Sequence, residues 1–583
     1  MRLFFVGLIF IMTLSAQARE FSLKIEANSI SSLSPEERNA IHSSLEAVEG
    51  LLPTKIKEAL APQVTLRFPL LSSEKIREKW ERWIRGILLR EIFRLYDDKN
   101  HTLSDHPVFL TAAGWTKQGL IVKTRSQSSN NERRNNPEPG DLNDPQEFMA
   151  ENFELFLSDP EYKCRRPSLA RLFQKFFNHI PFPTEHCTQS HQVLLEPDIL
   201  VDLIPQTIEL DLSRLYQIDY LLASKGETIS SRWGHSMYRF VFCKPGRPLG
   251  PNCRWDTAYH IVASFAAKVD SAEASPLKGL TGAYESRLFF SRFRKVLQDY
   301  TKKELRELIS LPLNLSSQQK TQFVYRLLEQ YWSYKGSYRF LTNNCAHEAL
   351  SVLQVAMDSR FLAEKTALSP NGLFDLLAET RLVDKQVLTD KIHAEEQSFF
   401  VPSFKLRFND AIKNLKIGVR ASFLLEQRIE NLSTEPAIIQ RRLIFDTIGS
   451  SLHGRIGKVS RYHRSLLASL YLIEDYAFTL SQLELSHKMR QKLEEALKAE
   501  GLDQMITKLL LPKPIEGLEG GYGIPLASEV ESNNDPSQSA IPAELLHRIR
   551  LLSEKIQKSH SLEIERLQRE DKQKLEILNL LTS

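Results

Sequence analysis

The segment Tyr338-Arg-Phe-Leu-Thr-Asn-Asn-Cys-Ala-His-Glu-Ala-Leu350 decides the fold of the central part of this 583-residue chain. Asn344 is a good helix N-cap, and apolar residues recur behind it at helical spacing (Ala349, Val352, Leu353 and Ala356). The pattern predicts a helix over Asn344 to Met357, with Cys345 in its first turn. A helix start favours thiolate over thiol, so Cys345 is a candidate nucleophile.

The cysteine pattern points to the same residue. The chain has five cysteines, and an odd cysteine stands out in an oxidising compartment. Local pairing is the simplest arrangement and predicts the disulfides Cys164–Cys187 and Cys243–Cys253, which leaves Cys345 as a free thiol. A zinc site is the competing interpretation, with Cys345, His347, Cys243 and Cys253 as ligands. Their spacing does not match the paired pattern of zinc sites, so we predict no metal.

A thiol nucleophile needs a base, and His235 is the candidate. It opens a predicted strand, His235 to Phe242, directly after a glycine. His260, on a second predicted strand from Thr257 to Ala267, is the expected third residue that orients the imidazole, with Asp256 as the runner-up. The predicted oxyanion or supporting residues are Asn344, Asn343 and Ser236.

These motifs resemble a known family. Gly234-His235, Ser264-Phe265, Tyr300 with Glu304-Leu-Arg306, and Tyr338 with Asn343-Asn344-Cys345 are similar to the motifs of the Lnb-type N-terminal periplasmic domain. Asn344-Cys345-Ala-His347 also resembles the permuted papain-like fold of NlpC-like peptidases and lecithin:retinol acyltransferases. The resemblance covers about residues 206 to 360, within a predicted domain over 206–380, and implies that Cys345 is the nucleophile and His235 its base. Lnb-type proteins carry transmembrane helices after this domain, and no such apolar stretch follows here, so the resemblance does not single out a lipoprotein among the envelope substrates.

Residues 19–205 are expected to form a mainly helical domain. In Arg90-Glu91-Ile-Phe-Arg94, arginines stand where a zincin helix would carry its two zinc-binding histidines. The segment from Pro145 to Phe156, with Glu151, resembles the zincin helix that supplies the third ligand. We expect a degenerate zincin-like domain without metal, in which Glu91 pairs with a nearby arginine. An ordinary amphipathic helix is an equal alternative, and in either case the domain would serve binding or scaffolding.

The C-terminal part is expected to be helical. The pattern predicts a helical domain over 390–511, a linker over 512–542 rich in Gly, Pro, Ser and Asn, and one long amphipathic helix over 543–583. The apolar stripe of that helix is typical of packing against a neighbouring helix. A role as a peripheral membrane or protein-binding helix is the alternative. The fold class is therefore α+β, with a permuted papain-like central domain between helical flanks.

The N-terminus predicts export. Arg2, an apolar run from Leu3 to Leu14 and Ala16-Gln-Ala18 make a signal peptide over 1–18, with an uncleaved anchor as the alternative. The expected location is the periplasm. Formal net charge is +4, and basic residues alternate with acidic ones, which argues against a nucleic-acid partner.

Together these features predict a periplasmic, cysteine-dependent acyltransferase or hydrolase without a cofactor. It would act on an ester or amide of an envelope lipid, lipoprotein or peptide. Two alternatives stay open: a non-enzymatic envelope scaffold with a relict thiol site, and a peptidoglycan endopeptidase.

Overall fold

The computed structural model of the chain divides into two compact units, 1–113 with 138–187, and 114–137 with 188–583. The structure describes residues 21–26, 30–31, 33–60, 63–66, 80–100, 103–117, 128–130, 144–184, 186–196, 206–226, 231–268, 284–334, 336–339, 343–419, 432, 435–452, 460–501, 522–533 and 543–582. The predicted signal peptide, 1–18, lies outside the described residues. Within these ranges, no helix has both the length and the apolarity needed to cross a membrane.

The first unit is mainly helical, as predicted. Its helices are α1 (Pro35–Leu51), α2 (Thr54–Leu60), α3 (Trp80–Asn100), α4 (Pro107–Ala112), α5 (Pro145–Ser158), α6 (Tyr162–Arg165) and α7 (Pro167–Phe177), and β1 (Ser22–Ile25) pairs in parallel with β2 (Gln63–Leu66). The rings of Phe93, Phe153 and Phe173 form part of an aromatic core between α3, α5 and α7. The disulfide Cys164–Cys187 encloses α7 and confirms the predicted pairing.

A seven-stranded antiparallel sheet organises the second unit. Its order is β12 (Gly336–Tyr338), β10 (Tyr284–Arg292), β9 (Ile261–Lys268), β8 (His235–Phe242), β7 (Leu215–Ala223), β11 (Leu308–Pro312) and β13 (Phe400–Val401). The strand predicted at His235 to Phe242 is confirmed. β9 begins at Ile261, four residues later than predicted, because 257–259 form a turn. Smaller antiparallel pairs are β3 (Trp115–Lys117) with β4 (Ser128–Asn130), and β5 (Gln192–Leu194) with β6 (Thr207–Glu209).

Both faces of the sheet are covered. Tyr220, Leu222, Tyr238, Phe240 and Phe265 join the core formed with α10 (Ser317–Ser333), α11 (Cys345–Ala356) and α13 (Pro370–Glu379). The side chains that alternate with them, among them Leu221, Ala223, Met237 and Val262, pack against α9 (Phe293–Leu297) on the opposite face. The mixture of helices with a sheet agrees with the predicted α+β class.

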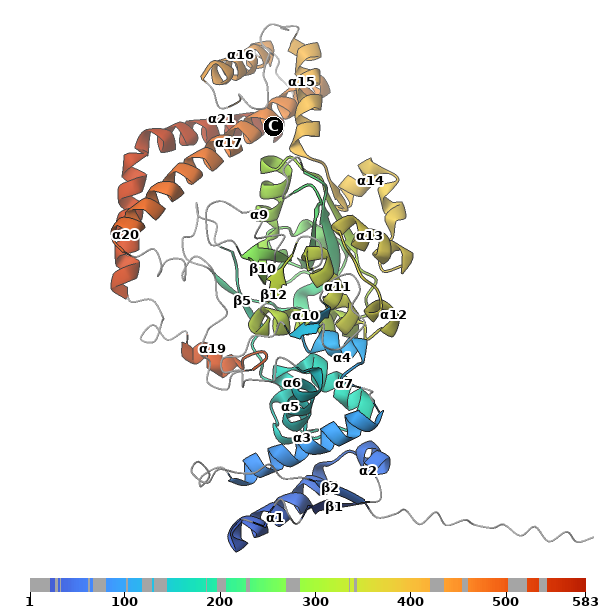
Figure 1. The fold of residues 1–583 in the computed structure, drawn as a ribbon. Coiled ribbons are helices and arrows are strands. Elements are labelled where there is room, and N and C mark those ends of the chain that lie inside the picture. Colours follow the sequence, from blue (N-terminus) through green and yellow to red (C-terminus); the bar gives the residue numbers. More distant parts are fainter. Residues whose placement is uncertain are drawn as a thin grey trace, which may run out of the picture. The chain divides into compact units, whose positions relative to one another are not determined.

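A helical bundle follows the sheet. It contains α15 (Phe404–Val419), α16 (Glu435–Leu452), α17 (Arg461–Ala499), α20 (Ala543–Ser559) and α21 (Ser561–Thr582). Figure 1 shows α17 and α21 side by side. Ile577 of α21 is fully buried in the bundle core. The prediction of one helix over 543–583 is wrong, because a turn at His560 separates α20 from α21. The apolar stripe of α21 does pack against a neighbouring helix.

Two further predictions about secondary structure, for 302–309 and for 512–542, are wrong for one shared reason. Residues Lys302 to Ile309, which the sequence pattern predicts as a helix, do not form one: the π-helical turn η5 (Gln298–Lys303) ends at Lys303, and β11 follows from Leu308. The expected linker over 512–542 contains α19 (Ala527–Asn533), and its Ile524 is fully buried in the core of the sheet. In both segments short apolar stretches contact residues distant in the sequence, and local composition cannot predict such contacts.

Candidate functional site

Cys345 opens helix α11, as the sequence predicted. The Asn344 side chain caps this helix, and its Oδ1 accepts hydrogen bonds from the N–H groups of Ala346 (2.9 Å) and His347 (3.2 Å). Its Nδ2 donates to the carbonyl of Leu368 at 2.9 Å. Cys345 is a free thiol whose residue is only 3% exposed. The cap therefore fixes the start of the helix around a buried sulfur.

The buried sulfur has hydrogen-bond donors around it, yet it is not a thiolate at rest. Burial raises the pKa of the Cys345 thiol, and hydrogen bonds from the Ser236 N–H, the Tyr338 hydroxyl and the helix start only partly oppose this. The helix start does favour the thiolate, as expected, but it does not outweigh the burial that raises the pKa of Cys345. Desolvation of the charged form outweighs the donors, because the first turn lies inside the core.

The raised pKa gives a pH test. We expect the rate at which iodoacetamide alkylates Cys345 in the folded protein to keep rising above pH 8.5, the approximate pKa of an ordinary thiol. The thiol is the dominant form below that pH, and each further step in pH creates more thiolate. The measurement is the alkylation rate by mass spectrometry from pH 6 to pH 10. A plateau already reached below pH 7 would show instead a preformed thiolate.

His235 stands at the first position of β8, held by a close backbone approach. Gly234 has φ +84°, and a Cβ there would lie 2.9 Å from the carbonyl oxygen of Ala223, so only glycine fits. The Nε2 atom of His235 lies 2.7 Å from Ser264 Oγ on β9, and its ring stacks on Tyr300 with centroids 6.1 Å apart. Burial, with a smaller contribution from Arg306, lowers the pKa of His235 to about 4. The imidazole is therefore neutral at physiological pH.

Cys345 and His235 belong to one neighbourhood. The backbone N–H that donates to the sulfur is that of Ser236, the residue next to His235. The charge of the Cys345 thiolate also acts on Tyr300, the residue that stacks on the His235 ring. Alternation along β8 points the side chains of His235 and Ser236 to opposite sides of the strand.

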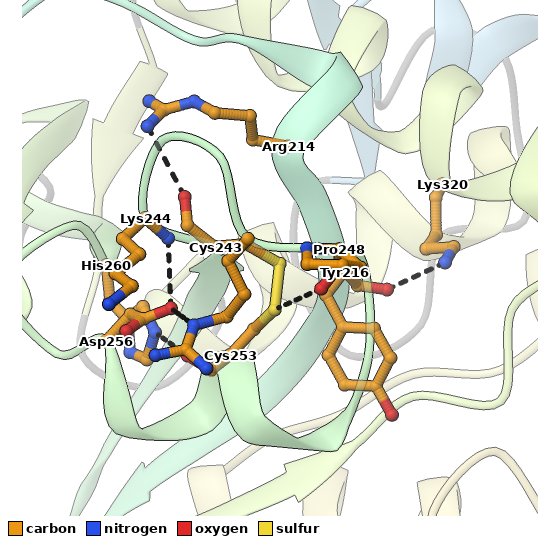
Figure 2. The surroundings of a disulfide bond; sticks show 10 residues. Arg214, Tyr216, Cys243, Lys244, Pro248, Cys253, Asp256, His260 and Lys320 are labelled. Carbon is orange, nitrogen blue, oxygen red and sulfur yellow. Dashed lines mark hydrogen bonds and ion pairs between the residues drawn. A yellow bond between two sulfur atoms is a disulfide. The ribbon is translucent and has the colours of Figure 1, made fainter.

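His260 and Asp256 do not lie at His235. His260 is fully buried, its Nδ1 is 2.9 Å from Arg239 Nη2, and its Nε2 is 2.8 Å from the carbonyl oxygen of Cys253. Figure 2 shows His260 beside the disulfide Cys243–Cys253, where Asp256 accepts from the Lys244 N–H and pairs with Arg247 at 2.7 Å. Both ring nitrogens of His260 are engaged there, whereas the side chain within hydrogen-bond distance of the His235 ring is that of Ser264.

The other predicted support residues hold the framework. Ser236 Oγ lies 2.8 Å from the Tyr220 hydroxyl, which in turn donates to the Pro370 carbonyl at 2.8 Å. Asn343 Nδ2 donates to Glu348 Oε1 at 2.9 Å. The side chains of Asn343 and Asn344 are thus engaged in structural bonds, and the donors that reach the sulfur are backbone N–H groups and a tyrosine hydroxyl.

Glu348 is a buried carboxyl group that sequence reasoning missed. It lies one helical turn after Cys345 and accepts from the Tyr334 hydroxyl, from Asn343 and from Ser286 Oγ at 3.3 Å. Burial raises its pKa to about 7, although these donors oppose the shift. The i, i+3 spacing from Cys345 was the available signal, since it places both residues on one helix face.

A second buried polar cluster lies on the same sheet. The Asp219 carboxylate is fully buried and accepts from Arg254 Nη1 (3.1 Å), Arg254 Nη2 (2.8 Å) and Ser310 Oγ (2.7 Å). Arg239, also fully buried, donates to Ser310 and to the carbonyl of Ser398. Burial lowers the pKa of Arg239 to about 9. This cluster ties β7, β8 and β11 to the segment before β13.

The second predicted disulfide, Cys243–Cys253, is confirmed. It joins Cys243, the residue directly after β8, to Cys253 in the 3₁₀ turn η4 (Pro251–Trp255). Two of the four residues considered as zinc ligands are therefore bonded to each other. In the part of the chain that the structure describes, no group of three or more His, Cys, Asp or Glu side chains could hold a metal ion.

In the first unit, both arginines at the zincin-like positions are ion-paired. Arg94 pairs with Glu91 at 2.9 Å and with Glu147 at 2.5 Å, and Arg90 pairs with Glu154 at 2.5 Å. The predicted pairing of Glu91 with an arginine is confirmed. The carboxylates that α5 contributes to these pairs are Glu147 and Glu154.

Comparison with known proteins identifies two regions. Residues 206–380 match the family model of the Lnb N-terminal periplasmic domain, and residues 84–186 match a domain of unknown function, DUF7844. Comparisons with the curated proteins and with the solved structures found no match. The first match covers the sheet except for β13, and it includes the Cys345 helix. Together with the two disulfides, it is consistent with a periplasmic, envelope-related protein.

Proposed function

We propose that the chain is a periplasmic, cysteine-dependent acyltransferase or hydrolase that acts on an ester or amide of an envelope substrate. One observation carries the proposal: a free thiol at the start of a capped helix shares its neighbourhood with a histidine whose Nε2 lies within hydrogen-bond distance of Ser264 Oγ. The Lnb-type match over the same residues supports it. The permuted papain-like arrangement suggested by the motifs belongs to the same proposal.

Because the Cys345 thiol and the His235 imidazole are both neutral, the proposed mechanism includes a proton transfer from the thiol to the imidazole. If Ser264 Oγ accepts from the Nε2–H of His235, Nδ1 is free of a proton and takes the one from the Cys345 thiol as sulfur attacks the carbonyl carbon. The tetrahedral intermediate collapses when His235 returns that proton to the leaving alcohol or amine, and a thioester remains on Cys345. Water, or an amine or hydroxyl acceptor, then attacks the thioester with His235 again as base, which releases the acyl group and restores the thiol.

Backbone donors would stabilise the oxyanion. The backbone N–H groups of Ser236, Ala346 and Cys345 reach the sulfur and are the candidate donors for an oxygen that develops beside it. Asn343 and Asn344 would act indirectly, by holding the helix start in place.

A covalent intermediate tests the proposal. Incubation of the protein with phospholipids, lipopeptides and muropeptides, followed by acid quenching and mass spectrometry, should reveal a mass increase equal to one acyl group on the peptide that contains Cys345. Cys345→Ala should show no such adduct. Muropeptides as the reactive class would favour the endopeptidase function, and the absence of any adduct and any turnover would favour a scaffold with a relict thiol.

For the first unit we propose a binding or scaffolding role on a zincin-like framework. The observation that favours it is that Arg90 and Arg94 occupy the ligand positions and are ion-paired to α5 carboxylates. Cationic side chains at these positions repel a divalent metal ion.

A further inference from the structure

The turn between α9 and β11 has an unusual backbone. Residues Gln298–Lys303 form the π-helical turn η5, and Leu305 has φ +54°, a left-handed conformation that non-glycine residues seldom adopt. The turn is closed by hydrogen bonds from the Arg306 N–H to the Tyr300 carbonyl (2.8 Å) and from the Glu304 N–H to the Asp299 carbonyl (2.9 Å). Such strain persists only where the surroundings hold it, and it clusters at functional sites.

One side of this turn faces the candidate site. Tyr300 stacks on the His235 ring, and the Arg306 guanidinium lies 4.9 Å from the Tyr300 centroid. Arg306 is buried and donates to the carbonyls of Ser224 (2.5 Å) and Ala223 (3.2 Å). Ala223 is the residue opposite His235 in the β7–β8 register. The turn therefore contacts His235 directly and also holds the strand residue that is paired with it.

The other side of the turn faces the C-terminal helical bundle. Leu305 packs against the bundle core. Lys302 Nζ lies 2.5 Å from Asp475 Oδ2 and 3.3 Å from Thr479 Oγ1, both on α17. The left-handed conformation at Leu305 lets its side chain point to the bundle while its neighbours Tyr300 and Arg306 contact the sheet.

We propose that the C-terminal bundle positions His235 through the turn 298–306, so that a change in the packing of α15 and α17 alters the Cys345 site. The inference rests on the proposed function, because the position of His235 matters to chemistry only if it serves Cys345. It makes Leu305 and Lys302 positioning residues and the bundle a regulatory element. Without the bundle contacts the turn keeps only its own hydrogen bonds and those of Arg306 to the sheet, and we expect Tyr300 to shift away from the histidine ring.

The first experiment measures the position of the His235 ring by NMR and does not depend on catalytic activity. In full-length protein labelled with ¹³C-histidine, the His235 signal is assigned by its loss in His235→Gln, and the Tyr300 ring current should displace it from the ordinary histidine position. Tyr300→Leu calibrates the size of this displacement. Lys302→Met and Leu305→Ala should remove a large part of it. Lys303→Met is the matched control, since Lys303 is an exposed neighbour with the same charge, and it should leave the signal unchanged.

The same variants are then tested for the rate of Cys345 acylation. We expect Lys302→Met to lower it by about tenfold, since small misplacements of a catalytic group are costly, and Lys303→Met to leave it unchanged. An unmoved His235 signal in both Lys302→Met and Leu305→Ala overturns the inference, as does an equal shift in Lys303→Met. A moved signal with unaltered acylation overturns the Cys345–His235 pairing instead, so the two failures are distinguishable. If Leu305→Ala does not fold, Lys302→Met decides alone.

Discussion

Cys345→Ala should abolish acyl-enzyme formation and turnover, and His235→Gln should lower the rate of acylation by about 10²- to 10⁴-fold, the range that general acid–base catalysis contributes. The reason is that burial keeps Cys345 as a thiol, so its proton must leave during the attack. His235, with its pKa near 4, is available as a neutral acceptor at all physiological pH values. The measurement is single-turnover acylation followed by mass spectrometry at pH 7.

Two further variants test whether the loss of activity is specific to His235. Ser264→Ala should have a smaller effect than His235→Gln, since the imidazole stays but loses the hydroxyl that holds its Nε2. His347→Gln is the control, because it changes a histidine two residues after Cys345 on the same helix and should leave acylation close to the wild-type rate. Retention of full activity by Cys345→Ala, or equal losses in His347→Gln and His235→Gln, would exclude the assignment.

Asp219→Ala should destabilise the second unit by about 3–5 kcal/mol, the usual consequence of removing one partner of a buried ion pair. Arg254, which is 6% exposed at its side chain, would lose its carboxylate, and Arg239 nearby would lose the compensating charge. The measurement is the free energy of unfolding from urea denaturation, followed by tryptophan fluorescence.

Asp211→Ala is the matched control for this change. Asp211 also pairs with an arginine, Arg214, but the two side chains are 44% and 30% exposed. An exposed pair contributes at most about 1 kcal/mol, so this variant should unfold close to the wild-type midpoint. If Asp219→Ala does not fold, Asp219→Asn keeps the shape and removes only the charge. Equal stability of the Asp219 and Asp211 variants would contradict the role of the cluster.

The parts of the site that depend on local sequence were predictable. The Asn344 cap, the helix behind Cys345, the strand from His235 and both disulfides follow from residues close together in the chain. The orienting residue was not predictable, because it depends on how β8 and β9 align. Met237 pairs with Ser264, so Ser264 reaches the end of β8 where His235 lies, while His260 comes before β9 beside the disulfide.

The charge state of the sulfur could not be predicted either. A helix start favours a thiolate in any sequence, but the opposing desolvation comes from the burial of Cys345 in the core of the sheet and its helices. The same limit explains β11: the sequence pattern predicts a helix over Lys302 to Ile309, but Leu308–Pro312 pairs with β7 as a strand.

The burial of Ile524 has a practical consequence for dissecting this protein. A fragment cut at the borders of the Lnb-type match, 206–380, would lack Ile524 from its core, the β13 strand from its sheet edge and the Ser398 carbonyl that Arg239 and Arg254 bind. The region recognisable by sequence is thus smaller than the region that folds. Recombinant work on the cysteine should therefore begin with the whole second unit, because a minimal domain would expose apolar surface and aggregate.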